Sequence, residues 1–132
     1  MKRYITSLLA ALLLGSAVAL AEGPGIEFVV TSHDFGNISE DGDPVSCEFE
    51  FTNTGDEPLV IISANASCGC TRPEFPKKPV KPGKTGKIKI TYLPKGRPGE
   101  FNKTVRVRTN AKRPKAVNLK ISGVVIPGSD HD

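Results

Sequence analysis

The sequence contains few side chains that can carry out chemistry. Its 132 residues include two histidines, three cysteines and one methionine. His131 lies in a polar C-terminal tail, so His33 is the one histidine inside the expected domain. No Ser-His-Asp or Cys-His-Asn set can be assembled without using His33 in each of them. We therefore expect no catalytic residue and no enzyme, and we expect His33 to cap or pack beside Asp34.

The patterns of several other functional classes are also missing. No amphipathic helix follows residue 21, and no glycine-rich loop precedes a helix, so a phosphate-binding loop is not supported. The carboxylates fall in turns and on outer strand faces without an inward pair, which argues against glycosidase chemistry. Aromatic residues are scarce, at 6%, and most are in core register, which argues against binding of nucleic acid. We expect no nucleic-acid partner and no cofactor.

The first residues have the pattern of a secretory signal peptide. Lys2 and Arg3 precede an apolar run, and Ala19-Leu20-Ala21 places small residues at −3 and −1 of a cleavage site. The run is short and rich in alanine, which favours cleavage over a retained membrane anchor. We expect a signal peptide over 1–21, a domain over 22–126 and a disordered tail over 127–132. This predicts a periplasmic or secreted protein with no transmembrane segment after cleavage.

Apolar and polar residues alternate with a period of two through much of the remaining sequence. The clearest case is Val45 to Thr52, where Cys47, Phe49 and Phe51 fall on the apolar side. Other strands, bounded by Gly and Pro turns, are expected over residues 26–30 continuing through 33–36, 58–64, 86–93, 101–109 and 117–125. This pattern predicts an all-β fold, an immunoglobulin-like Greek-key β-sandwich of about seven strands. The apolar run Leu59 to Ile62 suggests burial on both of its faces.

Charge is distributed unevenly along the chain. Residues 22–76 hold eleven acidic residues and one basic residue, whereas residues 77–132 hold fifteen basic and three acidic ones. In one compact domain such halves can pair with each other. The second and fifth strands of an immunoglobulin-type sandwich are neighbours, so their outer faces would bring together two acidic residues and two lysines: Glu48 and Glu50 with Lys87 and Lys89.

Three other basic residues have fewer acidic residues near them. Arg106, Arg108 and Lys120 alternate with apolar residues on the strands expected over 101–109 and 117–125. They would therefore lie outward on the second sheet of the sandwich. If the protein has a basic contact face, we expect it there.

Six separated motifs stand in order along the chain: His33-Asp34-Phe35-Gly36, Phe49-x-Phe51-x-Asn53-Thr54-Gly55-Asp56-x-Pro58-Leu59-x-Ile61, Ser67-Cys68-Gly69-Cys70-Thr71, Lys81-Pro82-Gly83, Pro98-Gly99-x-Phe101-x-Lys103 and Thr109-Asn110. With these motifs the sequence resembles the bacterial family called domain of unknown function 1573, over about residues 31–125. The family resembles immunoglobulin-like modules of the Hydin type. The resemblance implies an exported bacterial protein and implies no activity.

The cysteines are the remaining candidates for a site. Export would place them in an oxidising compartment, and their odd number leaves at least one thiol over. A structural staple would join Cys68 to Cys70, or either of them to Cys47. A bridge to Cys47 would close a loop of about twenty residues and contribute about 3 kcal/mol. The resemblance favours Cys68–Cys70, because both belong to the family motif, and Gly69 would permit the bend of so small a ring.

Two chemical alternatives remain for Cys68 and Cys70. As thiolates they can hold a soft ion such as Cu(I) or Zn, although a closed site would need Cys47, His33 or a second chain. As a small-ring disulfide they can exchange with other thiols, since strained disulfides are labile. The sequence has no C-x-x-C motif and no thioredoxin-like pattern to support exchange.

These observations favour an exported, non-enzymatic, immunoglobulin-like module that binds or scaffolds another protein of the envelope or the extracellular space. The soft-metal or thiol-redox site at Cys68 and Cys70 is the alternative function. The contact surface is expected at an exposed strand edge or at the face that bears Arg106, Arg108 and Lys120.

Overall fold

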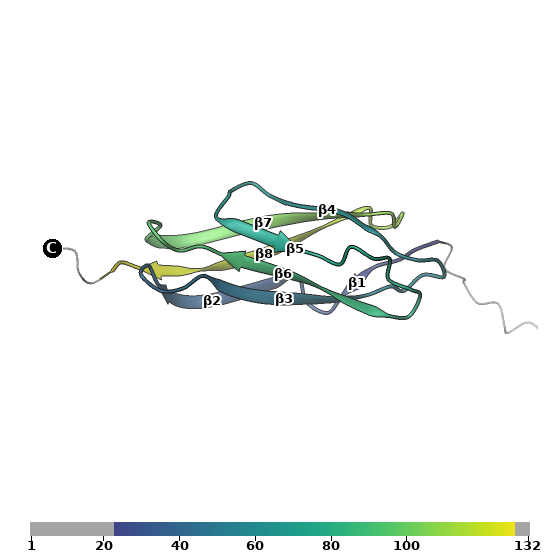
Figure 1. Ribbon diagram of the computed structural model, residues 1–132, viewed down its shortest axis with the longest axis horizontal. Coiled ribbons are helices and arrows are strands. Elements are labelled where there is room, and N and C mark those ends of the chain that lie inside the picture. Colours follow the sequence, from purple (N-terminus) through teal and green to yellow (C-terminus); the bar gives the residue numbers. More distant parts are fainter. Residues whose placement is uncertain (1–22, 129–132) are drawn as a thin grey trace, which may run out of the picture.

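The structure is a computed structural model that describes residues 23–128, and these residues form a β-sandwich of eight strands (Figure 1). The expected signal peptide and the expected tail beyond residue 128 lie outside the described residues. The strands are β1 (Glu27–Phe28), β2 (Ser32–Ser39), β3 (Val45–Thr52), β4 (Ile61–Ala66), β5 (Thr71–Glu74), β6 (Thr85–Tyr92), β7 (Gly99–Thr109) and β8 (Ala116–Ile126). No helix in this part of the chain is long and apolar enough to cross a membrane.

The strands form two sheets of four, with the orders β1-β3-β6-β5 and β2-β8-β7-β4. We call them the β3–β6 sheet and the β7–β8 sheet. All paired strands are antiparallel except β2 and β8, which run parallel. The chain changes sheets five times, after β1, β2, β3, β4 and β6. The predicted immunoglobulin-like sandwich is confirmed, with eight strands in place of about seven.

The core lies between the sheets and is made by the period-two pattern. Alternate residues of β3, β6, β7 and β8 point inward, because successive side chains of a strand face opposite sides of the sheet, and most of these inward residues are buried. Tyr92 stacks on Phe101 across the two sheets, with ring centroids 3.9 Å apart. The inward residues with an exposed fraction below 2% include Phe49, Phe51, Ile88, Ile90, Val105, Val107, Leu119 and Ile121.

The run from Leu59 to Ile62 does not have the predicted burial on both faces. Leu59 and Ile61 are buried, but the side chain of Ile62 is 60% exposed. The strand begins only at Ile61, and a bulge shifts the pairing with β7 between Ile61 and Ser63. Since β4 is the edge strand of its sheet, Ile62 points into solvent at this bulge.

Asn53 explains much of the longest family motif. Its side chain is fully buried and makes four hydrogen bonds to backbone groups. The Oδ1 atom accepts from the amides of Gly25 (3.2 Å) and Gly55 (2.8 Å). The Nδ2 atom donates to the carbonyls of Glu57 (2.8 Å) and Val80 (2.9 Å). Asn53 therefore joins three segments that are distant in sequence, because buried backbone groups need partners.

Asn110 has a similar role at the same end of the sandwich. Its Oδ1 atom accepts from the amide of Val60 at 2.9 Å, and its Nδ2 atom donates to the carbonyl of Pro58 at 3.3 Å. These bonds attach the segment before β4 to the end of β7. The asparagines of two family motifs thus hold the loops in place.

Candidate functional site

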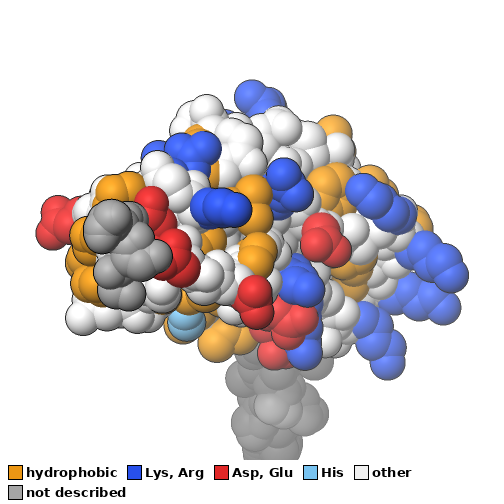
Figure 2. Space-filling model, turned by 60° about the vertical axis from the view of Figure 1, so that its left-hand side comes forward, with side chains coloured by type: hydrophobic (Ala, Val, Ile, Leu, Met, Phe, Trp, Pro, Cys, Tyr) orange, Lys and Arg blue, Asp and Glu red, His pale blue; other side chains and the backbone are white. Residues whose placement is uncertain are grey.

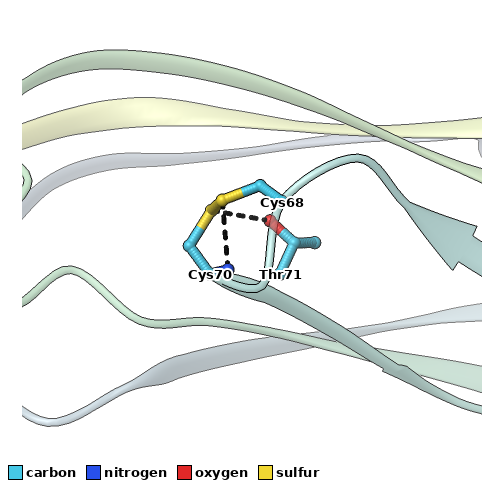
Figure 3. Close-up of a disulfide and its surroundings, with 3 residues drawn as sticks. All are labelled: Cys68, Cys70 and Thr71. Carbon is cyan, nitrogen blue, oxygen red and sulfur yellow. Dashed lines mark hydrogen bonds between the residues drawn. A yellow bond between two sulfur atoms is a disulfide. The ribbon is translucent and has the colours of Figure 1, made fainter.

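The Cys68-Gly69-Cys70 motif lies where the chain crosses from β4 in one sheet to β5 in the other. Cys68 and Cys70 form a disulfide with their Cα atoms 5.1 Å apart (Figure 3). Cys70 is buried in the core, whereas Cys68 is half-buried. The carbonyl of Cys70 accepts from the Leu93 amide at 2.9 Å, and the carbonyl of Cys68 accepts from the Thr71 amide at 3.1 Å. The disulfide and the Cys68–Thr71 bond close the turn of the crossover, and the Leu93–Cys70 bond attaches it to the end of β6.

Two further contacts place the sulfur atoms. The Cys68 Sγ atom accepts from the Cys70 amide at 3.0 Å, and the Cys70 Sγ atom lies 3.5 Å from the Thr71 hydroxyl. The glycine between the cysteines is not required by the backbone, contrary to the expectation from sequence. Its φ lies outside the left-handed region, and a Cβ there would meet nothing within 4 Å. The ring forms at Gly69 without the special freedom of glycine.

Cys47 is held apart from this motif by the register of the β3–β6 sheet. It lies opposite Ile90 of β6, and Ile90 lies in turn opposite Pro73 of β5. Two strand spacings separate β3 from β5, which is about 10 Å. A disulfide needs Cα atoms within about 7 Å, so the alternative bridge from Cys47 to Cys68 or Cys70 does not fit this register.

The Cys47 thiol is half-buried at one margin of the sandwich. Burial raises its pKa to about 11, because the apolar surroundings disfavour the thiolate. Such a thiol is a poor nucleophile near neutral pH. Cys47 is therefore a small, half-buried side chain at the margin of the sandwich, without the lowered pKa of a reactive cysteine.

The other expected metal ligand is engaged elsewhere. His33 packs edge-on against Phe35, with ring centroids 4.6 Å apart. Over residues 23–128 no three side chains of His, Cys, Asp or Glu are grouped as a metal site would require. Because the disulfide occupies both sulfur atoms of the motif, binding of Cu(I) or Zn there would first require reduction.

The outer faces of the two sheets differ in how their charges are matched. On the β3–β6 sheet, Glu48 lies opposite Lys89 and Glu50 opposite Lys87, in agreement with the predicted strand order. The Lys87 Nζ atom also lies 3.7 Å from the Glu48 carboxylate. Positive and negative charges are therefore in register on this face.

The β7–β8 sheet carries the three predicted basic residues, Arg106, Arg108 and Lys120, and all are exposed on its outer face. None of them has an acidic residue opposite it, since their register partners on the adjacent strands are Asn65, Ser63, Asn118, Ala116, Thr104 and Ser32. Arg106 donates to the Asn118 side chain at 3.4 Å. We call these three residues the basic face.

The loop between β7 and β8 extends the positive charge of this sheet. Lys112, Arg113 and Lys115 are exposed in this loop, which directly follows the strand of Arg106 and Arg108. Sequence reasoning missed these three residues because it considered the periodic strands alone. Figure 2 shows one view of the surface, with Lys and Arg side chains gathered along its right-hand side.

Solved structures with the same fold are distant in sequence. A protein of unknown function from Porphyromonas gingivalis W83 is 18% identical with a TM-score of 0.69, covering 83% of this chain and 50% of that one. A PapD-like domain of human CEP192 is 17% identical with a TM-score of 0.62, and the match covers 92% of this chain and 97% of that domain. The periplasmic chaperone SfaE is 16% identical with a TM-score of 0.52, covering 80% and 59%. The chain thus spans about half the length of the Porphyromonas protein.

The sequence comparisons give one match, to a family model. No curated protein matches the chain. The model of the family described as "Protein of unknown function (DUF1573)" matches residues 26–125, which include all eight strands except the last residue of β8. The fold agrees with this match, as do the motif residues Asn53 and Asn110 that hold its loops. The chain belongs to the DUF1573 family.

Proposed function

We propose that this chain is a non-enzymatic binding module that works in the periplasm or outside the cell and holds another envelope or extracellular protein. The signal-peptide pattern over 1–21 supports the location. The periplasmic chaperone SfaE has a similar fold. In this proposal the Cys68–Cys70 disulfide is a structural staple at the crossover between the sheets.

The observation that carries the proposal is the unmatched positive charge of the basic face. On the β3–β6 sheet, Glu48 and Glu50 lie opposite Lys89 and Lys87. Arg106, Arg108 and Lys120 have only uncharged register partners. Arginine side chains on a flat strand surface suit bidentate contacts with carboxylates. The expected partner therefore presents an acidic surface, and charge complementarity would speed and orient its docking.

The test captures partners from envelope extracts with the purified chain lacking residues 1–21. We expect the double variant Arg106→Gln, Arg108→Gln to lose a captured protein that the unchanged chain retains, and we expect capture to weaken as salt increases. The matched control is Lys87→Gln, Lys89→Gln, which removes the same charge from the other sheet. Equal capture by both double variants would refute the basic face as the contact surface. Failure of the unchanged chain to retain any protein would refute the binding function.

A further inference from the structure

One margin of the β3–β6 sheet is open along most of β3. On that side β3 pairs with β1 through only two register partners, Thr52 with Glu27 and Phe51 with Phe28. The Val29 amide adds one bond to the Glu50 carbonyl, at 3.0 Å.

The chain then leaves this sheet abruptly. The Thr31 carbonyl already accepts from the Lys120 amide of β8 at 2.9 Å. Within residues 23–128, no strand pairs with Val45 to Phe49 on the side away from β6. We call this stretch the open edge.

The direction of the backbone groups follows from the Val29 bond. In an antiparallel ladder the amide and carbonyl of one residue point to the same side, and successive residues alternate. The Glu50 carbonyl points toward β1, so the amides and carbonyls of Ser46 and Glu48 point outward at the open edge. An added strand would find four backbone groups there in the geometry of a sheet.

The inward side chains at this margin are apolar and only partly covered. Val45 and Cys47 are half-buried, whereas Phe49 and Phe51, farther along β3, are buried. Phe28, Phe35 and Ile38 also pack against the core while remaining partly exposed. Just beyond β1, the side chains of Val29 and Val30 are 70% and 54% exposed. The inward residues of an added strand would therefore meet apolar neighbours.

Two of the outward side chains of β3, Glu48 and Glu50, are acidic. From Glu27 to Glu50 the sequence has seven Asp and Glu residues and neither Lys nor Arg. The two acidic residues on β3, Glu48 and Glu50, face Lys89 and Lys87 of β6 on their other side. A strand added at the open edge, with basic residues at alternate positions, could place them beside Glu48 and Glu50, as β6 places Lys89 and Lys87.

We propose that the open edge accepts an extended segment of another protein, in which apolar residues alternate with Lys or Arg, as an added strand beside Val45 to Phe49. A second copy of this chain, paired symmetrically through its own β3, is disfavoured because the Glu48 side chains would approach each other. This surface belongs to the sheet that does not carry the basic face, so the inference goes beyond the proposed function. A module that binds on both sheets can bridge two partners.

Hydrogen exchange by NMR on the labelled chain, without residues 1–21, tests the proposal. The probe is a short synthetic peptide in which valine alternates with lysine, and its control replaces lysine by glutamate. The Ser46 and Glu48 amides should exchange quickly in the free chain and slowly with the lysine peptide. Alkylation of Cys47 should slow as well, because the added strand covers the thiol.

A matched pair of charge variants adds a second arm. Glu48 and Glu74 both lie opposite Lys89, on the two sides of β6, and both are exposed. Glu48→Lys should weaken binding of the lysine peptide about three- to tenfold, as expected for reversing a cross-strand charge pair, whereas Glu74→Lys should change it less than twofold.

Four outcomes would overturn the proposal. The first is that the peptide leaves the exchange rates of the Ser46 and Glu48 amides unchanged. The second is that the amides it slows lie in another strand, and the third is that the two charge variants weaken binding equally. Concentration-dependent protection of Ser46 and Glu48 without peptide would overturn it in favour of self-association. None of these outcomes depends on Arg106 or Arg108, so failure here is distinguishable from failure of the proposed function.

Discussion

Replacement of Asn53 by alanine should bring the domain close to its limit of stability. The substitution removes four hydrogen bonds to backbone groups, the amides of Gly25 and Gly55 and the carbonyls of Glu57 and Val80. The Val80 carbonyl keeps its bond from the Leu59 amide at 2.9 Å, so loss of its bond from Asn53 costs about 0.5–1.5 kcal/mol. The other three are partly buried, and each contributes about 0.5–1.5 kcal/mol.

The expected loss is therefore about 2–6 kcal/mol, against a total of about 5–15 kcal/mol for a typical domain. Because the sequence has no tryptophan, urea unfolding is best followed by circular dichroism. Asn102→Ala is the matched control, since Asn102 is exposed on the outer face of β7. If the two variants unfold within about 1 kcal/mol of each other, the argument that Asn53 organises the loops is wrong.

Two further predictions concern the cysteines. Replacing Cys68 and Cys70 by serine should lower the free energy of unfolding by only about 1–2 kcal/mol, because the closed loop is so small; a loss as large as that of the Asn53 variant in the same urea assay would contradict this. Folding raises the pKa of Cys47, so the folded state binds the thiol proton more tightly than the unfolded state does. The contribution of this proton to the free energy of unfolding is fully present below the unfolded pKa. Between the ordinary thiol pKa of 9.0 and the raised pKa of about 11, the free energy of unfolding should therefore decline with pH more steeply in the unchanged chain than in Cys47→Ala. Equal slopes in thermal unfolding would refute the assignment.

The sequence predicted those parts of the fold that depend on local alternation. The alternation of β3 predicts its inward and outward faces, and the immunoglobulin-type strand order then places Glu48 and Glu50 against two lysines. The same parity predicts an outward position for Arg106 and Arg108. Their lack of acidic neighbours becomes visible only when the register with β4 and β8 is known.

Other features had no local signal. β5 is four residues long and contains Pro73, and a short segment with proline is typical of a loop. A sheet tolerates proline in an edge strand, and β5 is an edge strand. The exposure of Ile62 comes from a bulge that hydropathy does not reveal. The open edge beside Cys47 depends on where the chain leaves one sheet for the other after Val29, which is a property of the topology.

The parallel pairing of β2 with β8 has a consequence for the order of folding. It joins residues 32–39 to residues 120–126, so nearly the whole domain is the loop that this pairing closes. The entropy of closing so long a loop is lost before the contacts can compensate it, and folds dominated by such pairings form slowly. A growing chain that has not yet produced β8 has no partner for β2 and leaves one side of β7 unpaired. The β7–β8 sheet can therefore be completed only when almost the entire domain has been synthesised.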